Sequence, residues 1–303
     1  SKASSRFSHA VFFSKSEFKK QVMKHKKQIK KLFDFDPIVF RNTELIYNNE
    51  IAKFVEDLGY EAILAEGADH ILGWRSPNYV YEPHGTDKLK LLLKNYKLSD
   101  DIAFRFSNRS WNEWPLTTGK YLEWIRKTEG NTINLFMDYE TFGEHQWEDT
   151  GIFNFLNSFP KEAIREDINF KFPREIAKFK SSDKIDVPFA VSWADQERDL
   201  SAWMGNRIQN SALNEIYKIE KAVYNSNEPE IIEDWRKLQT SDHFYYMCTK
   251  WFSDGDVHKY FNPYDTPYDS YINFMNVLND LVSRIKKSKH DKLLEKPSVL
   301  VNK

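Results

Sequence analysis

The feature that most constrains the fold of this 303-residue chain is the alternation of short apolar runs with amphipathic segments over its first two thirds. Apolar runs bounded by turn residues predict buried strands, and a 3.6-residue apolar period predicts helices. The expected strands cover residues 38–40, 62–67, 102–107, 132–140 and 187–193. Helices are expected between them, one of them ended by Gly59. This alternation predicts an α/β fold built on a parallel sheet or an α/β barrel.

The sequence changes character after about residue 197, where the apolar positions follow a helical period. Ile272, Met275, Leu278 and Val282 are one such series. We therefore expect three parts: an α/β barrel domain over residues 1–195, a helical C-terminal domain over 196–287, and a flexible tail over 288–303. A lysine-rich amphipathic helix is also expected over residues 16–32, with its charges in solvent.

Composition narrows the choice of partners. The chain has 44 Lys and Arg against 45 Asp and Glu, a net charge of -1, so no nucleic acid and no anionic membrane surface is expected as a partner. Aromatic residues make up 16% of the chain, with 9 Trp and 15 Tyr. Such a content fits either a densely packed core or flat apolar surfaces on which sugar rings stack. Composition alone favours the core.

Cysteine and histidine usage limits the chemistry further. Cys248 is the single cysteine, which excludes an internal disulfide framework and fits a reducing compartment. No long apolar run and no signal-like segment occurs, so we expect a cytoplasmic protein. The eight histidines are scattered, without an HxxxH or CxxC motif. No P-loop or GxGxxG motif is present either. The sequence therefore predicts no metal site and no cofactor.

Acidic residues follow several of the predicted strands. In FMDYETFGEHQ (136–146), Asp138 and Glu140 lie two residues apart and share one face of a strand. Glu44 and Glu66 follow two earlier strands. The carboxyl ends of parallel strands meet at one edge, where burial and neighbouring acids raise carboxyl pKa values. Such a set suits glycoside hydrolysis, which needs a pair of carboxyl groups. The alternative is a group of solvated acids where strands end.

Several long motifs resemble the α-amylase-like branch of glycoside hydrolase family 57. They are FRNTELIYN (40–48), LAEGADHILGWRSPNYVY (64–81), FMDYETFGEHQ (136–146) and SWADQERDLSAWMGN (192–206), in this order. Residues 240–264 are similar to the family's helical C-terminal part. The resemblance implies an incomplete, seven-stranded (β/α) barrel followed by a C-terminal helical bundle. It also implies retaining chemistry on α-glucans, with an α-glucan or maltooligosaccharide as the substrate.

The resemblance also implies roles for particular residues. Glu44, in a Thr-Glu pair, looks like the nucleophile, and Asp138 looks like the general acid/base. Glu66 is the competing choice for the nucleophile and otherwise a substrate-binding acid. We expect Asp138 to be shielded from solvent beside Glu44, and Glu140 to be more hydrated. The other expected substrate-binding residues are His9, Arg41, Trp74, Glu140, His145, Trp193, Asp195, Asp199 and Trp203. The three tryptophans among them are candidate stacking platforms, although a tryptophan taken alone is more often a core residue.

Two departures from the family pattern leave alternatives open. The family's opening strand, with its His-Gln-Pro motif, has no counterpart in this chain, and the following motif keeps Ser8-His9 but not its glutamate. We therefore expect that the chain begins one or two strands into the barrel and that the whole protein contains the missing part. A 4-α-glucanotransferase or branching enzyme would use the same covalent intermediate. A non-catalytic glucan-binding homologue is the third option. A metal-dependent polysaccharide deacetylase is disfavoured because the histidines do not cluster.

Overall fold

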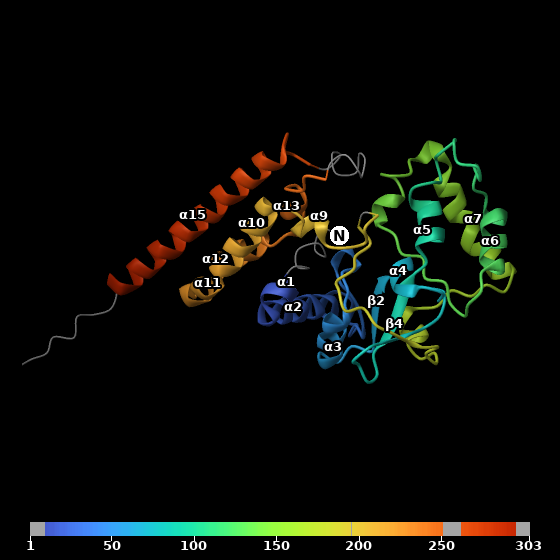
Figure 1. The fold of residues 1–303 in the computed structure, drawn as a ribbon, viewed down its shortest axis with the longest axis horizontal. Coiled ribbons are helices and arrows are strands. Elements are labelled where there is room, and N and C mark those ends of the chain that lie inside the picture. The colour runs from blue at the N-terminus through green and yellow to red at the C-terminus, as the bar shows by residue number, and fades with distance from the viewer. Residues whose placement is uncertain (1–9, 195, 251–261, 295–303) are drawn as a thin grey trace, which may run out of the picture. The chain divides into compact units, whose positions relative to one another are not determined.

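The computed structural model describes residues 10–194, 196–250 and 262–294, and these form two compact units (Figure 1). One unit, Phe35–Trp193, is called the α/β unit below. The other, called the helical unit, combines the described residues up to Asp34 with those from Ala194 onward. The predicted barrel domain over 1–195 thus includes an N-terminal segment that packs with the C-terminal helices instead. Segments far apart in the chain share one core here, which a division by sequence position does not foresee.

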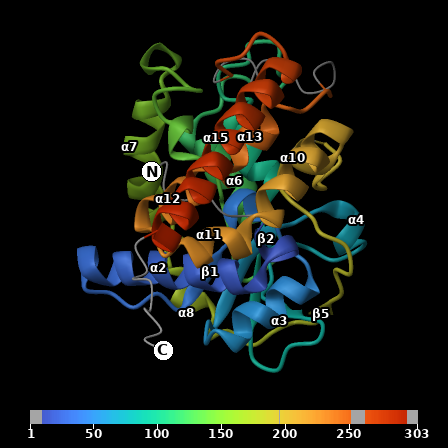
Figure 2. The same cartoon turned by 90° about the vertical axis from the view of Figure 1, so that its left-hand side faces the viewer.

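The α/β unit is built on a three-stranded parallel sheet in the order β1–β2–β4. Its strands are β1 Val39–Arg41, β2 Ala62–Glu66 and β4 Lys90–Lys94. Helices α3 Asn49–Asp57 and α4 Asp69–Leu72 occur between them in sequence, and α3 lies beside β2 (Figure 2). Two short strands, β3 Glu82–Pro83 and β5 Lys184–Ile185, form a separate parallel pair. The fold class is therefore α/β, as predicted.

Burial explains why these segments are strands. Ala62, Ile63, Leu91 and Leu92 are at most 1% exposed. A parallel strand covered on both faces reads as a continuous apolar run rather than an alternation, and β4 has the sequence KLLLK. In the preceding helix α3, the side chain of Asn48 accepts a hydrogen bond from the Ile51 amide and so caps the N-terminus. Gly59, just past its end, has φ of +85°, as a helix-terminating glycine does.

Three of the predicted strands are not strands in the described residues. The range 102–107 was expected to be extended, but α5 Tyr96–Ala103 is a helix followed by turns. The ranges 132–140 and 187–193 form only isolated bridges, Asn134 with Lys94 and Val191 with Tyr47. A strand needs a ladder of paired residues along its length, and each of these two segments forms a bridge at one position only. The described residues therefore contain fewer strands than the seven that the resemblance implies.

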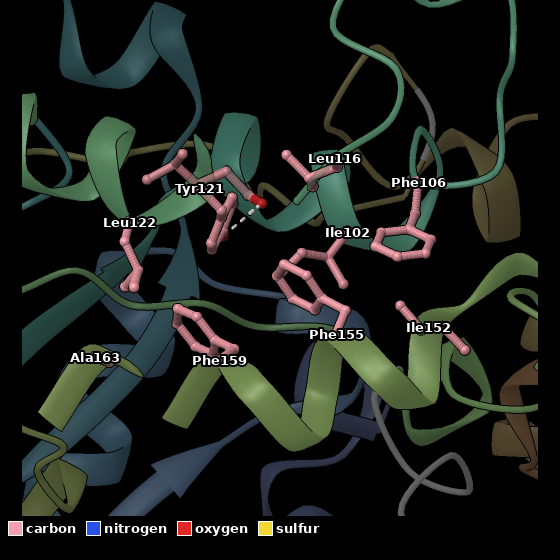
Figure 3. Close-up of a cluster of buried hydrophobic side chains, with 10 residues drawn as sticks. Ile102, Phe106, Leu116, Tyr121, Leu122, Ile152, Phe155, Phe159 and Ala163 are labelled. Carbon is pink, nitrogen blue, oxygen red and sulfur yellow. Dashed lines mark hydrogen bonds between the residues drawn. The ribbon is translucent and has the colours of Figure 1, made fainter. Parts of the chain in front are cut away.

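A second core fills the remainder of the α/β unit. Helices α6 Thr118–Lys127 and α7 Ile152–Arg165 pack together, with η3 Glu148–Thr150 leading into α7. Figure 3 shows Phe155 and Phe159 of α7 on the side that faces Tyr121 and Leu122 of α6, in one buried cluster with Ile152 and Ala163. The rings of Phe155 and Phe159 stack with centroids 5.6 Å apart, and the Tyr121 hydroxyl donates to the Leu98 carbonyl at 2.9 Å. This aromatic cluster accounts for part of the high aromatic content.

The helical unit contains the lysine-rich helix predicted over residues 16–32 and most of the C-terminal helices. Its described helices are α1 Ala10–Phe13, α2 Lys15–Phe33, α9 Ser201–Met204, α10 Arg207–Lys218, α11 Glu220–Ser226, α12 Pro229–Leu238, α13 Ser241–Tyr245 and α15 Pro267–Leu294. Helix α15 runs along α10, α11 and α12 (Figure 1). It includes residues 288–294, which the sequence predicted to be part of a flexible tail. None of the helices described is both long and apolar enough to cross a membrane.

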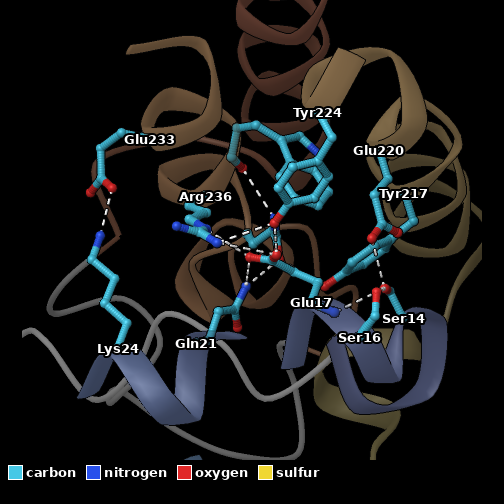
Figure 4. A network of polar contacts seen from close by, with 12 residues as sticks. Ser14, Ser16, Glu17, Gln21, Lys24, Tyr217, Glu220, Tyr224, Glu233 and Arg236 are labelled. Carbon is cyan, nitrogen blue, oxygen red and sulfur yellow. Dashed lines mark hydrogen bonds and ion pairs between the residues drawn. The ribbon is translucent and has the colours of Figure 1, made fainter. Parts of the chain in front are cut away.

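A buried polar network joins α2 to the C-terminal helices (Figure 4). Glu17 is 0% exposed. Its carboxylate accepts hydrogen bonds from the Gln21 side chain at 2.7 Å, from Arg236 Nε at 2.8 Å, and from the Tyr224 hydroxyl. Gln21 also donates to Gln239 at 2.9 Å. Every partner of the carboxylate comes from α2, α11 or α12, so the network fixes the N-terminal helix to residues about 200 positions later in the chain.

Candidate functional site

The candidate site of the α/β unit lies where the parallel strands end. β1 is followed by Glu44, β2 ends at Glu66, and β4 ends at Lys94, which is paired in register with Glu66. Lys94 also forms a parallel bridge with Asn134, four residues before Asp138. Because parallel strands present their carboxyl ends at one edge, these charged residues follow the same edge of the sheet.

Glu44 lies in a strained turn. It is the central residue of the 3-10 helix η1 Thr43–Leu45, with φ of +55° and ψ of +21°, and Leu45 also has φ of +51°. Residues other than glycine rarely adopt this left-handed conformation, which costs about 1–3 kcal/mol and persists only where neighbouring contacts enforce it. Asn42, 4% exposed, supplies such contacts, because its side chain accepts from the Thr43 amide at 3.0 Å and donates to the Ile46 carbonyl at 3.1 Å.

Trp193 holds the Glu44 carboxylate directly. The indole Nε1–H donates to Glu44 Oε2 at 2.7 Å, and the Trp193 amide donates to the Glu44 carbonyl at 3.0 Å. The Arg41 guanidinium carbon lies 4.8 Å from the centre of the indole ring, and Lys94 Nζ lies 5.0 Å from it. Both distances suit cation–π contacts. Trp193, predicted to be a stacking platform, therefore already contacts two cations with its ring and a carboxylate with its edge.

Glu66 and Lys94 form the most buried charged group of the site. Glu66 is 2% exposed and Lys94 is 5% exposed. Glu66 Oε1 accepts from the Gly67 amide at 2.8 Å, and Glu66 Oε2 lies 3.8 Å from Lys94 Nζ. Lys94 Nζ lies 3.1 Å from Asp100 Oδ1, on α5. A Cβ atom on Gly67 would lie 2.2 Å from the Lys94 carbonyl oxygen, so only glycine allows β2 and β4 to end this close together.

Sequence reasoning missed Lys94 and Asp100. The strand that carries Lys94 was not predicted, because KLLLK is short and has a charge at each end. Its signal is the uninterrupted apolar run itself, which is typical of a parallel strand buried on both faces. Asp100 lies on a helix that begins at the buried Asn95, whose side chain accepts from the Leu98 amide at 3.0 Å. An asparagine before an apolar-periodic segment is a recognisable start signal.

Asp138 begins the 3-10 helix η2 Tyr139–Thr141 and is exposed, as Glu140 is. The expectation that Asp138 would be shielded is therefore wrong in this structure, because the chain leaves its strand-like path at Asp138 and turns toward solvent, whereas Glu140 is exposed as expected. Protein atoms around the carboxyl group still raise the pKa of Asp138 through desolvation. Arg41, His145 and Lys94 act in the opposite direction, and Glu140 raises this pKa further.

The loop after Asp138 is anchored at its far end. Gln146, 2% exposed, donates from its side chain to the Ala103 carbonyl at 2.9 Å. Gly143, with φ of +112°, donates its amide to the Gln146 carbonyl at 2.9 Å. The half-buried His145 donates its amide to the Glu140 carbonyl at 2.9 Å. These bonds fix the course of the loop that carries Asp138, Glu140 and His145.

The remaining predicted site residues have different surroundings. The Trp74 side chain is 88% exposed, with the Arg75 guanidinium carbon 5.2 Å from its ring. Trp203, in the helical unit, is 2% exposed and lies beside Tyr245 with ring centroids 6.0 Å apart, so it is a core residue rather than an open platform. Asp199 accepts from the Ser201 amide at 2.8 Å next to the start of α9. His9 and Asp195 lie outside the described residues.

The candidate site as a whole is a cluster of acids and cations at the strand ends of an α/β protein. Arg41 and Lys94, the cations that contact the Trp193 ring, also act with His145 against the rise in the pKa of Asp138 that burial causes. They therefore connect Glu44, held by Trp193, with the second candidate acid. Within residues 10–194, 196–250 and 262–294, no group of three or more His, Cys, Asp or Glu side chains is arranged to hold a metal ion.

Comparison with known proteins places this α/β protein in a family. The model of glycosyl hydrolase family 57 matches residues 4–188, and the chain belongs to this family. A curated protein of Methanocaldococcus jannaschii named "Putative alpha-amylase" is 46% identical over 299 residues. The match covers 93% of this chain and 64% of that protein, so the chain spans less than two thirds of its relative's length. The resemblance inferred from the motifs is thereby confirmed.

Solved structures share the fold at low sequence identity. A 4-alpha-glucanotransferase from Thermococcus litoralis matches with a TM-score of 0.60 and 18% identity, over 78% of this chain and 42% of that one. A branching enzyme of family 57 from Thermococcus kodakaraensis gives 0.59 and 14%, over 88% and 63% of the two chains. An alpha-amylase from Thermotoga maritima gives 0.56 and 12%, over 92% and 67%. At these identities the likeness concerns the fold alone.

Proposed function

We propose that this protein is a retaining glycoside hydrolase that acts on α-1,4-glucans, with Glu44 as nucleophile and Asp138 as general acid/base. The observation that carries the proposal is the fixed position of Glu44. A strained backbone turn and the Trp193 indole N–H hold its carboxylate at the carboxyl edge of the sheet. Strain of this kind persists where the surroundings enforce it, and it is concentrated at functional sites.

The chemistry requires one carboxylate and one carboxylic acid. Asp138 would donate its proton to the glycosidic oxygen while Glu44 attacks the anomeric carbon, so that the C–O bond to the leaving sugar breaks as the glycosyl–Glu44 ester forms. Asp138, now a carboxylate, would take a proton from water, whose oxygen attacks the same carbon and releases Glu44. The raised pKa of Asp138 supports the first role, because it keeps the carboxyl group protonated at higher pH than an ordinary aspartate.

Burial favours Glu44 over Glu66 as the nucleophile. Glu44 is half-buried, whereas Glu66 is 2% exposed, and its Oε1 and Oε2 face the Gly67 amide and Lys94 respectively. An attacking oxygen must reach the anomeric carbon of a polymer, which a carboxylate inside the protein does not do without rearrangement. We propose that Glu66 orients the cations of the site. Any contact of Glu66 with a sugar hydroxyl would be made only by the edge of its carboxylate.

The sheet order supports a barrel of the type that the family resemblance implies. The strands follow one another in chain order, β1, β2 and β4, and the bridge to Asn134 extends the same series. Sequential parallel neighbours with helices between them are the pattern of a (β/α) barrel. We propose that the α/β unit is part of an incomplete, seven-stranded barrel, and that the helical unit corresponds to the C-terminal bundle.

Product analysis on maltoheptaose tests the function. A hydrolase should release shorter maltooligosaccharides with new reducing ends, and proton NMR of the first products should show the α-anomer. A 4-α-glucanotransferase would instead form longer and shorter chains without a net gain of reducing ends, and a branching enzyme would create α-1,6 linkages on a longer glucan. Binding of maltoheptaose without turnover would overturn the proposal in favour of a non-catalytic glucan-binding protein.

A further inference from the structure

We propose that Lys94 is a positioning residue of the glucan site: it fixes the Trp193 indole that holds Glu44, and it sets the local charge around Asp138. The inference rests on the proposed function and adds to it a residue that acts on both candidate catalytic acids. Neither the motifs nor the apolar pattern of the sequence singled out this lysine.

Burial and pairing give Lys94 a fixed position. Its side chain is 6% exposed and its Nζ lies 3.1 Å from Asp100 Oδ1 and 3.8 Å from Glu66 Oε2. A buried ammonium group is stable only when it is paired, so two acids from different elements, β2 and α5, hold the head group in place.

The contact with Trp193 transmits that position to Glu44. Lys94 Nζ lies over the indole, 5.0 Å from its centre, while the indole N–H donates to Glu44 at 2.7 Å. A cation over the face attracts the π-electrons of the ring. The attraction keeps the ring in one orientation, and the loss of electron density makes the N–H a stronger donor. Lys94 therefore acts on Glu44 through the indole. Arg41, which is exposed, contacts the same ring and acts on Glu44 in the same way.

The second action of Lys94 is on Asp138. The charged and titratable groups that act on this carboxyl are Arg41, Lys94, His145 and Glu140. The first three favour the carboxylate, and Glu140 favours the protonated acid. Lys94 is the buried member of the set. Without it, Asp138 would hold its proton to higher pH, so it would protonate the leaving group over a wider pH range but would serve less well as the base in the second step.

A comparison of Lys94→Met with Lys90→Met tests the proposal. Both lysines are in β4, at its two ends, and both pair with an acid, Lys90 with Glu82 at 2.8 Å. Lys94→Met should lower kcat about 10–100-fold, as expected when a reacting group is displaced, and should change KM less. The basic limb of its kcat/KM profile should move to higher pH. Lys94→Arg should restore most of kcat and bring the basic limb back to its wild-type position. Lys90→Met should leave both kcat and the position of the basic limb unchanged.

The indole resonance of Trp193 gives a readout that does not depend on turnover. Its ¹H–¹⁵N signal is assigned by its loss in Trp193→Phe. In Lys94→Met this signal should move to the position of a weaker hydrogen bond, and in Lys90→Met it should stay. If Lys94→Met does not fold, the pH profile and the indole signal are measured on Lys94→Gln instead, which also lacks the charge.

The two readouts separate failure of this inference from failure of the proposed function. An active wild type whose Lys94→Met variant keeps the pH profile and the indole signal, and loses only thermal stability, would overturn the positioning role. An inactive wild type would overturn the proposed hydrolase. The indole signal would then still decide the first half of the inference, because it reports on Trp193 and Glu44 without substrate.

Discussion

Glu17 in the helical unit and Glu66 in the α/β unit are both buried carboxylates beside a cation, 0% and 2% exposed. Glu17 receives hydrogen bonds from Gln21, Arg236 and Tyr224, so its charge is matched within one cluster. Glu66 instead shares one lysine, Lys94, with Asp100. Two carboxylates that share one cation are each stabilised less than a carboxylate that has a cation of its own, so the Glu66 cluster is the less favourable of the two for stability.

The two regions also differ in the backbone strain of their acidic residues. Glu17 lies in a regular helix, whereas Glu44 has φ of +55° inside η1. A cluster that only stabilises the fold gains nothing from a strained residue. Under the proposed function, the Glu17 network would provide stability, and the strand-end cluster would accept a local cost for chemistry. Variants that affect activity and stability separately test this division.

The largest effect is expected at Glu44. Glu44→Gln keeps the shape of the side chain but removes the nucleophilic charge, so kcat on maltoheptaose should fall about 10⁴-fold or more. Glu66→Gln, the matched control, should reduce activity less. Initial rates of reducing-sugar release measure both. If Glu66→Gln is the inactive variant and Glu44→Gln retains activity, Glu66 is the nucleophile and Glu44 is the substrate-binding acid.

Next in size is the loss expected for Asp138→Ala. General acid catalysis contributes about 10²–10⁴-fold, and mostly for substrates with poor leaving groups. Hydrolysis of maltooligosaccharides should therefore suffer far more than that of an activated aryl glycoside, and added azide should restore part of the second reaction. Glu140→Gln serves as the control and should affect both substrates alike. An equal loss on the two substrates, without azide rescue, argues against the acid/base role of Asp138.

The Glu17 network should affect stability instead of chemistry. Arg236→Met leaves the Glu17 carboxylate buried without its cation, which should lower the free energy of unfolding by about 3–5 kcal/mol. Arg284→Met removes a more exposed pair, Arg284 with Asp234 at 2.9 Å, and should cost about 1 kcal/mol or less. Urea unfolding followed by circular dichroism measures both. Activity per folded molecule should not change, and a large loss of kcat in Arg236→Met would remove the proposed division between the units.

The smallest effect concerns pH. Glu140 raises the pKa of Asp138, and catalysis needs the protonated form, so activity should decline as pH rises through that pKa. Glu140→Gln removes the negative charge, lowers this pKa, and should move the basic limb of kcat/KM to lower pH. Lys94→Met should move the limb in the opposite direction. Glu144→Gln, an exposed acid in the same loop, should not move it. If the basic limb of kcat/KM does not move in Glu140→Gln, the loss of activity at high pH is due to the titration of a group other than Asp138.

Part of the fold was predictable because its signals are local. Helix α3 has a capping asparagine, an apolar stripe and a terminal glycine, all within residues 48–59. The range 102–107 was wrongly predicted to be a strand, because its alternation also places Ile102 and Phe106 four residues apart. Both are buried against the aromatic cluster, while Phe104 between them is 60% exposed. A period of two and a period of four coincide in so short a segment, and only packing distinguishes them.

The site was predictable in its members but not in their connections. Glu44, Glu66 and Asp138 stand out because acids at the ends of apolar runs are rare in a buried sheet. Trp193 was identified as a ring for stacking, yet its edge donates to Glu44, 149 positions earlier in the chain. Lys94 was missed because its partners, Glu66 and Asp100, become neighbours only when β2, β4 and α5 are assembled.

The sequence by itself determined the α/β class, the family, the main helices and the acids at the strand ends. These features depend on residue types at short spacings, which folding does not alter. The tertiary structure decided which residues share a cluster. Ser14 and Glu17 have the spacing of a capping box, but Glu17 instead binds Arg236, which is 219 positions away. Long-range packing chooses between such alternatives because a buried charge is stable only beside the partner that the assembled chain provides.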